Sequence, residues 1–268
     1  MILQFISLAS GSSGNCYYFG TDDYGILVDA GIGVRMIKKS MKENNLSFEK
    51  IIALFITHDH ADHIKSAGFL GEKYGIPVYT TLDIHAGMQR SYGMTQKLYQ
   101  SKRIISKDVT FELRDFKITP FEVPHDGSDN VGYFIEFGNT SFAIATDLGH
   151  ITPTVTHYMS KAKNIIIESN YDQEMLNHGS YPIHLKKRIM GYNGHLSNKE
   201  CSEFLAQIYT PELKSIFLCH LSRDNNHPEL AYKTIEYRLI MEGIKVGKDL
   251  LLVALKRNNP SDLYEFEA

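Results

Sequence analysis

The run His58-Asp59-His60-Ala61-Asp62-His63 places three imidazoles and two carboxylates within six residues. Crowding such groups and removing them from water costs free energy unless a cation binds them. Neutral imidazole and carboxylate are ligands that suit Zn²⁺, Mn²⁺ or Fe²⁺. A solvated His-rich loop is the alternative interpretation. We take the run as a predicted metal site, since its composition has no simple structural purpose.

The spacing within the run indicates two neighbouring sites. Positions 58 and 60 can point the same way in extended chain, whereas positions 62 and 63 lie at the entry to the next helix and can face a second point. A structural site closes with four ligands, but a catalytic site recruits ligands from elsewhere and keeps one position open. Three further candidates each follow a predicted strand: His125, Asp147 and His220. A lone histidine after a strand is an ordinary polar loop residue, but three residues at the same kind of position favour ligands.

Short apolar runs and turn signals predict the elements that position these residues. The run at 58–63 directly follows Ile51–Thr57, which is nearly all apolar, as a strand buried on both faces would be. Further strands are predicted at Ile2–Leu8, Cys16–Gly20, Gly25–Asp29, Phe116–Val123, Val131–Phe137, Ser141–Thr146, Asn164–Glu168, Ser215–Cys219 and Leu250–Leu255. Helices are predicted at Val34–Asn44, His63–Tyr74, Asp172–Asn177, Ile183–Met190, Asn198–Ile208 and Glu229–Met241. Strands and helices in both halves indicate one layered α/β domain over residues 1–268.

Composition excludes several classes of protein. The 268 residues are 43% hydrophobic and 22% charged, which excludes a disordered or fibrous chain. The net charge of −3 does not by itself indicate a nucleic-acid binder. Three widely spaced cysteines without a CxxC pattern are typical of free thiols in a reducing compartment. No window of about 18 apolar residues predicts a membrane span. We therefore expect a cytoplasmic protein without a membrane partner.

The order of the candidate ligands resembles a known family. The His58–His63 run, with Asp29, His125, Asp147 and His220, resembles the five sequential motifs of the metallo-β-lactamase-fold hydrolases over about residues 1–256. This resemblance implies a four-layer αββα sandwich and two divalent ions, Zn²⁺ or Mn²⁺. It assigns His58, His60 and His125 to the first ion, Asp62, His63 and His220 to the second, and Asp147 to a position bridging both. Asp29 would orient the ligands from behind.

Five further segments are similar to one nuclease group within that family, the YycJ/WalJ (VicX)-like proteins, which are related to ribonuclease Z and ribonuclease J. The segments are SGSSGN (Ser10–Asn15), VPHDGSDNVGY (Val123–Tyr133), ESNYD (Glu168–Asp172), GHLSN (Gly194–Asn198) and LCHLSRDNN (Leu218–Asn226). The similarity implies a 5′-to-3′ DNA exonuclease. Only 72 residues separate Asp147 from His220, so the large extra domain of ribonuclease J is absent.

The nuclease resemblance also suggests residues that act on substrate. His195 would protonate the leaving group, held by Glu168 as its acidic partner, and Asp62 completes the predicted catalytic set. His195 could instead cap the helix that begins near Asn198. In the Gly/Ser turn, Ser12 and Ser13 could form an anion-binding nest of backbone N–H groups or simply a turn.

Two stretches without acidic residues indicate a nucleic-acid partner, although the net charge of the whole chain does not. Residues 84–107 contain five basic residues and residues 184–199 contain four. In the first stretch, Lys97, Lys102 and Arg103 are predicted to contact phosphates, and the interleaved Tyr92 and Tyr99 could stack on bases. Either stretch could also be an ordinary solvated face.

These observations lead to one hypothesis with three rivals. The hypothesis is a dinuclear metal-dependent phosphodiesterase that acts on nucleic acid, with DNA favoured over RNA, and that uses a metal-bridging hydroxide as nucleophile. A small-molecule hydrolase of the same fold, such as a thioesterase or cyclic-nucleotide phosphodiesterase, is the main alternative. A di-iron redox protein would need a flavin-binding partner, and no flavin-binding segment is visible. A non-catalytic scaffold is disfavoured because every expected ligand is present.

Overall fold

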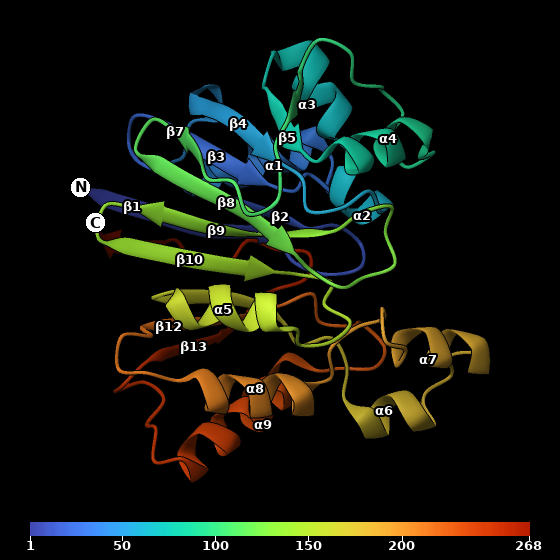
Figure 1. The fold of residues 1–268 in the computed structure, drawn as a ribbon, viewed down its shortest axis with the longest axis vertical. Coiled ribbons are helices and arrows are strands. Elements are labelled where there is room, and N and C mark those ends of the chain that lie inside the picture. The colour runs from blue at the N-terminus through green and yellow to red at the C-terminus, as the bar shows by residue number, and fades with distance from the viewer.

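A computed structural model describes all residues from 1 to 268, and it contains two mixed sheets that pack face to face (Figure 1). The first sheet has the order β14 (Tyr264–Glu267), β1 (Ile2–Ala9), β2 (Cys16–Gly20), β3 (Gly25–Val28), β4 (Ile51–Phe55), β5 (Val78–Thr80), β6 (Lys102–Ile104). The second has the order β13 (Leu251–Ala254), β12 (Ser215–Cys219), β11 (Asn164–Glu168), β10 (Thr140–Ala145), β9 (Val131–Phe137), β8 (Phe116–Glu122), β7 (Phe111–Leu113).

Helices cover the outer faces of both sheets. On the side of the first sheet lie α1 (Val34–Glu43), a 3₁₀ turn (Phe48–Lys50), α2 (Ala61–Ile64), α3 (Ala67–Tyr74) and α4 (Leu82–Arg90). On the side of the second sheet lie α5 (Pro153–Lys161), α8 (Asn198–Ile208) and α9 (Pro228–Met241), while α6 (Gln173–His178) and α7 (Ile183–Ile189) project beyond its edge. The predicted αββα sandwich is confirmed. None of these helices is both long enough and apolar enough to cross a bilayer.

The buried strand β11 shows how the layers form. Ile166 packs into the core between the sheets, whereas Ile165 and Ile167 pack under the helices of the second sheet. Successive side chains of a strand point to opposite faces, so a strand covered on both sides must be apolar throughout. The three isoleucines of β11, whose sequence is NIIIE, meet this requirement, and its two polar residues stand at the ends of the strand.

Strand direction brings the candidate site together. Strands β10, β11, β12 and β13 run parallel to one another, and β8 runs parallel to β10 because both are antiparallel to β9. In the first sheet β3 and β4 are parallel, and β1 shares their direction through β2. Within each sheet, the loops that carry the predicted functional residues therefore follow strands that share one direction. These strands are β1, β3 and β4 in the first sheet and β8, β10, β11 and β12 in the second.

The predicted helix His63–Tyr74 is wrong in one respect, because it is two helices. The chain leaves the helical ladder between α2 and α3, where the Ser66 N–H donates to the Ala30 carbonyl at 2.8 Å. The Asp62 carbonyl, in turn, accepts from the Asn15 N–H at 2.8 Å. Gly31 permits this approach, since a Cβ there would lie 1.6 Å from the Asp62 carbonyl oxygen. Contacts with distant segments thus interrupt the helix and hold the His58–His63 run in place.

Several short elements had no strong signal in the sequence. The stretch between α3 and β8 contains β5, α4, β6 and β7, and the three strands there have three residues each. The helix α5 was also not predicted, although Pro153 in its first turn and the Thr152 side-chain cap mark its start. The last strand, β14, pairs antiparallel with β1 and puts Phe266 opposite Leu3.

Candidate metal centre

Backbone conformation turns three of the candidate residues away from the strands that precede them. Asp29 after β3, Asp147 after β10 and His220 after β12 have φ angles of 61°, 50° and 52°. This left-handed region is uncommon for residues other than glycine, although aspartate, asparagine and histidine tolerate it best. Such conformations persist where surrounding structure fixes them, and they cluster at functional sites. Here the three carboxylate and imidazole groups meet in one buried space.

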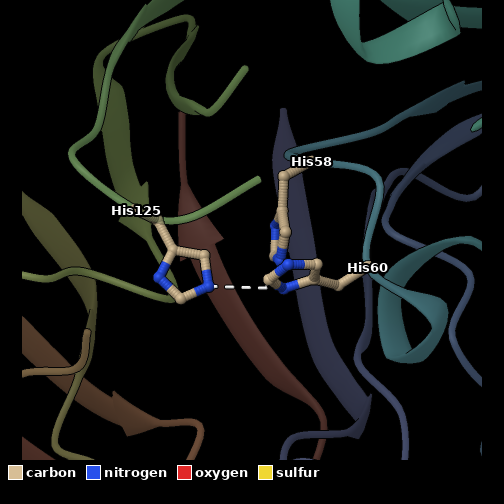
Figure 2. Close-up of side chains that lie close together, drawn as sticks. All are labelled: His58, His60 and His125. Carbon is tan, nitrogen blue, oxygen red and sulfur yellow. Dashed lines mark hydrogen bonds between the residues drawn. The ribbon is translucent and has the colours of Figure 1, made fainter. Parts of the chain in front are cut away.

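One group consists of three imidazoles, His58, His60 and His125. Figure 2 shows His58 and His60 reaching from the loop after β4 while His125 approaches from the opposite side. The His125 Nε2 lies 3.3 Å from the His60 Nδ1, and the His125 Nδ1–H donates to the Gly194 carbonyl at 2.9 Å. Fixing one ring nitrogen in this way directs the other nitrogen into the cluster.

A second group contains Asp62, His63 and His220. The His63 Nδ1–H donates to the buried Asp29 at 2.7 Å, so its Nε2 faces the cluster, 3.6 Å from an Asp62 oxygen. The His220 Nε2 lies 3.5 Å from the same oxygen. Asp147 lies between the two groups, since its oxygens are 3.0 Å from the His63 Nε2 and 3.6 Å from the His125 Nε2. Asp29 accepts the hydrogen bond that fixes the His63 ring, and its role as an orienting residue stays a prediction.

The chemistry of the clustered side chains, apart from any resemblance to a family, fits a divalent cation. The Nε2 atoms of His58 and His220 are buried without a hydrogen-bond partner. A buried polar atom without a partner is costly, and it calls for an ion or a water. Burial, followed by the repulsion of nearby His63, lowers the pKa of His58 well below its usual value, so its imidazole is neutral and offers a lone pair. The cluster is therefore suited to bind a divalent metal, while the assignment of each ligand stays a prediction.

Glu168, at the end of β11, holds two imidazoles at once. Its Oε1 accepts from the His195 Nδ1–H at 2.8 Å and from the His220 Nδ1–H at 2.7 Å. Its Oε2 accepts from the backbone N–H groups of Leu148 and Leu196 at 2.8 and 3.0 Å. Burial alone would raise the pKa of Glu168, but the attraction of His195 and these hydrogen bonds lower it to about 2. Glu168 is thus a fixed anion.

His195 does not act as the helix cap that was the alternative. The cap of α8 is Ser197, which forms a capping box with Glu200. The His195 side chain is 15% exposed, and it lines a cavity of about 220 Å³ together with His60, Asp62, Asp147 and His220. Its Nδ1–H is held by Glu168, so its Nε2 is the atom that can exchange a proton with a bound molecule. These contacts are compatible with the predicted catalytic pair, which remains to be tested.

Sequence reasoning did not identify two buried amides of the site. The Asn15 Nδ2 lies 3.0 Å from the His63 Nε2, and the Asn170 Nδ2 donates to the His220 carbonyl at 2.8 Å. Both residues lie in segments that were singled out, SGSSGN and ESNYD, but a single amide has no spacing pattern to mark it. Asp126 was also missed, although its carboxylate lies 3.4 Å from both His60 Nε2 and His125 Nε2.

The predicted substrate-binding residues occupy different places. Ser12 lines the cavity of the candidate site, whereas the Ser13 hydroxyl donates to Asn258 at 2.6 Å on the surface. Lys102 and Arg103 lie on the edge strand β6, where Arg103 is exposed. Lys97 is held by its own chain, since its ammonium donates to the Met88 and Ser91 carbonyls at 3.5 and 2.5 Å. The second basic stretch reaches the cavity through Arg188, which makes a two-pronged ion pair with Asp126.

The fold and this cluster together define a class of protein. The chain belongs to the metallo-β-lactamase-fold proteins: residues 24–220 match the family model described as "Beta-lactamase superfamily domain". Within that class, the chain is 35% identical to the protein of Bacillus anthracis named "Exodeoxyribonuclease YycJ", over 92% of this chain and 93% of that protein. The identity to "Exodeoxyribonuclease WalJ" of Streptococcus pneumoniae is 36%, over 92% and 91% of the two chains. The predicted membership of the YycJ/WalJ-like group is confirmed.

A solved structure supports the fold independently. The metallo-β-lactamase fold protein YhfI from Bacillus subtilis superposes with a TM-score of 0.71, covering 99% of this chain and 100% of that chain. Its sequence identity is 18%, so this likeness concerns the fold alone.

Metal uptake is expected to release protons and to weaken as the pH falls. Burial lowers the pKa of His220, but Asp147 and Glu168 raise it to about 10, and carboxylates likewise raise the pKa of His63 above its usual value. The His220 imidazole is therefore protonated in the metal-free protein at neutral pH, and a cation must displace that proton. Calorimetry of Zn²⁺ binding in two buffers of different ionisation enthalpy should give different heats. Equal heats in both buffers would contradict proton release.

Proposed function

We propose that this chain, as a single domain over residues 1–268, is a metal-dependent nuclease that hydrolyses phosphodiester bonds in DNA from a strand end. The observation that carries the proposal is the pair His195–Glu168, which adds a held proton donor to a cluster of candidate metal ligands. The two relatives named exodeoxyribonucleases, which align over nearly the whole chain, support DNA as the substrate. A 5′-to-3′ direction and a cytoplasmic location are parts of the same proposal.

The proposed cofactor is a pair of divalent ions, Zn²⁺ or Mn²⁺. His58, His60 and His125 would hold one ion and Asp62, His63 and His220 the other, with Asp147 between them. Mixed shells of imidazole and carboxylate accept both metals. When bound, such ions activate water for attack on phosphorus and neutralise charge on the phosphate oxygens.

The remaining chemistry belongs to side chains of this protein. His195 would donate a proton from Nε2 to the departing oxygen. This transfer requires a protonated His195, and Glu168 would stabilise that imidazolium. Burial lowers the pKa of His195, but the charge of Glu168 and its hydrogen bond outweigh burial and raise that pKa. This direction suits an acid, because more of the imidazole is protonated at neutral pH. Asp62 would contribute both to metal binding and to placing the attacking water.

One set of assays tests the function against its main alternative. The purified chain is incubated with end-labelled single-stranded and duplex DNA and RNA, each with Mn²⁺ or Zn²⁺, and with a thioester substrate. Stepwise shortening of DNA from one end supports the proposal. Thioester hydrolysis without cleavage of any nucleic acid would favour a small-molecule hydrolase instead.

The basic stretch 84–107 gives a prediction about affinity for long DNA. We expect Lys102→Glu/Arg103→Glu to raise the KM for long DNA and to flatten its salt dependence, because phosphate contacts act through counterion release. Hydrolysis of bis(p-nitrophenyl) phosphate should not change. Lys97 is left intact in this variant, since its ammonium holds two carbonyls at the end of α4. A salt slope equal to that of the unmodified protein would mean that β6 is an ordinary solvated edge.

A further inference from the structure

The loop Met190–Gly194, which joins α7 to His195, presents an aromatic ring next to the candidate metal centre. Tyr192 in this loop is 76% exposed, yet its ring lies against the His150 ring, with the centroids 3.6 Å apart and 31° between the planes. The His150 Nδ1–H also donates to the Tyr192 carbonyl at 2.9 Å. One face of the Tyr192 ring is therefore held by His150, and the opposite face is open to solvent.

Residues of the candidate site fix the backbone of this loop. The Gly194 carbonyl accepts a hydrogen bond from the His125 Nδ1–H at 2.9 Å. Gly149, two residues after Asp147, lies directly against the loop, because a Cβ there would be 2.4 Å from the Tyr192 carbonyl oxygen. The position of Tyr192 is thus set by segments that also carry candidate metal ligands.

Tyr192 lies within reach of a strand bound at the metal centre. It precedes His195 by three residues, so the two Cα atoms are at most about 11 Å apart. Bases in a stacked strand repeat about every 3.4 Å, so that distance corresponds to about three nucleotides. A strand with one phosphodiester beside His195 can therefore place a nearby base on the Tyr192 ring.

Basic side chains lie on the same segment as Tyr192. Arg188, in the last turn of α7, lines the cavity of the metal centre, and its ion pair with Asp126 uses Nε and Nη2 and leaves Nη1 for a phosphate. Lys187 beside it is exposed. A positively charged surface that also offers an aromatic ring is the arrangement by which proteins bind single strands without reading their sequence.

Rigidity distinguishes Tyr192 from other exposed tyrosines. Single exposed aromatic residues are ordinary on a protein surface. Tyr92, Tyr99 and Tyr237 are exposed as well, but their rings do not pack on another ring. A mobile side chain loses rotamer freedom when it binds, whereas the Tyr192 ring has already lost that freedom to His150.

We infer that Tyr192, supported by His150, is a stacking platform for an unpaired base of the strand whose phosphodiester lies at the metal centre. The inference rests on the proposed function and names its substrate class, a strand that is unpaired at the site. A base within a duplex is covered on both faces by its neighbours, whereas an unpaired base can offer a face to an aromatic side chain.

The test compares strands with and without bases in a metal-free buffer. Two oligonucleotides of equal length and charge are labelled at one end: one carries thymine bases, and the other is built from abasic residues. Fluorescence anisotropy in EDTA gives the affinity of each strand for the unmodified protein, Tyr192→Ala, Tyr192→Phe and His150→Ala. Tyr237→Ala is the matched control, because Tyr237 is an exposed tyrosine on α9, which covers the outer face of the second sheet.

We expect Tyr192→Ala to weaken binding of the thymine strand about 5- to 150-fold, the range for one stacked base, and to leave binding of the abasic strand unchanged. Tyr192→Phe should bind both strands as the unmodified protein does, since it keeps the ring. His150→Ala should weaken binding of the thymine strand by less than Tyr192→Ala, and Tyr237→Ala should have no effect. An equal loss on both strands in Tyr192→Ala, or no loss on either, overturns the inference, as does a lack of binding by the unmodified protein.

A blunt duplex that contains the thymine strand tests the substrate class. Tyr192→Ala should bind this duplex as tightly as the unmodified protein does, because its bases are stacked within the helix. A loss as large as that for the single strand would contradict recognition of an unpaired base. If the unmodified protein cleaves no DNA or RNA with Mn²⁺ or Zn²⁺, the proposed function fails, but the metal-free binding assay still decides the role of Tyr192.

Discussion

Asp147→Asn is expected to lower the affinity of the protein for both proposed divalent ions and to reduce DNA cleavage to background. Asp147 lies between the two groups of candidate ligands, and the substitution removes its charge while keeping its size. Loss of a residue that only orients a ligand already costs about 10- to 100-fold in metal affinity. Loss of a shared ligand should exceed that range. Elemental analysis after dialysis against limiting Zn²⁺ gives the metal content.

Two comparisons make this result specific. Asp108→Asn is the matched control, because Asp108 is also a left-handed aspartate, with a φ of 60°, but its carboxylate bonds only to Tyr158 on the surface. His220→Ala should release mainly one ion. Two ions retained by Asp147→Asn, or one ion or none in the unmodified protein, would contradict the dinuclear arrangement.

His195→Ala is expected to keep the metal content and to lower the turnover of DNA about 10²- to 10⁴-fold, which is the usual effect of losing a general acid. The loss should be smaller with bis(p-nitrophenyl) phosphate, since p-nitrophenolate leaves without a proton. The matched control is His157→Ala, an exposed histidine on α5 that pairs only with Lys161. Equal losses on both substrates would indicate that His195 only supports the loop around it.

The metal cluster could be predicted from the sequence because most of its candidate ligands lie in one short segment. The His58–His63 run supplies four candidate ligands, and the others each follow an apolar strand that is recognisable by itself. The common direction of those strands then brings their ends together. The amides of Asn15 and Asn170 could not be found in this way, since each contacts a histidine about 50 residues distant and neither has a local pattern.

The fold was predictable where elements are long and uniformly apolar. It was not predictable where contacts between distant segments determine the local structure. The three-residue strands β5 and β6 carry too few residues for a period of two to be visible. The break between α2 and α3 depends on Ala30 and Ile32, which accept from the Ser66 backbone and hydroxyl groups. No property of the segment 61–74 alone specifies that break.

The pairing of β14 with β1 has a consequence for the folding of the chain. β1 is largely apolar, and its partner on one side is β14 from the far end of the described chain, so that edge of β1 is unpaired until β14 docks. An unpaired apolar edge is a template for strands of other molecules. Once β14 docks, Tyr264 and Phe266 pack inward while Glu265 and Glu267 face solvent, which gives the finished sheet an acidic border. β14 thus closes an edge of β1 that could otherwise pair with strands of other molecules.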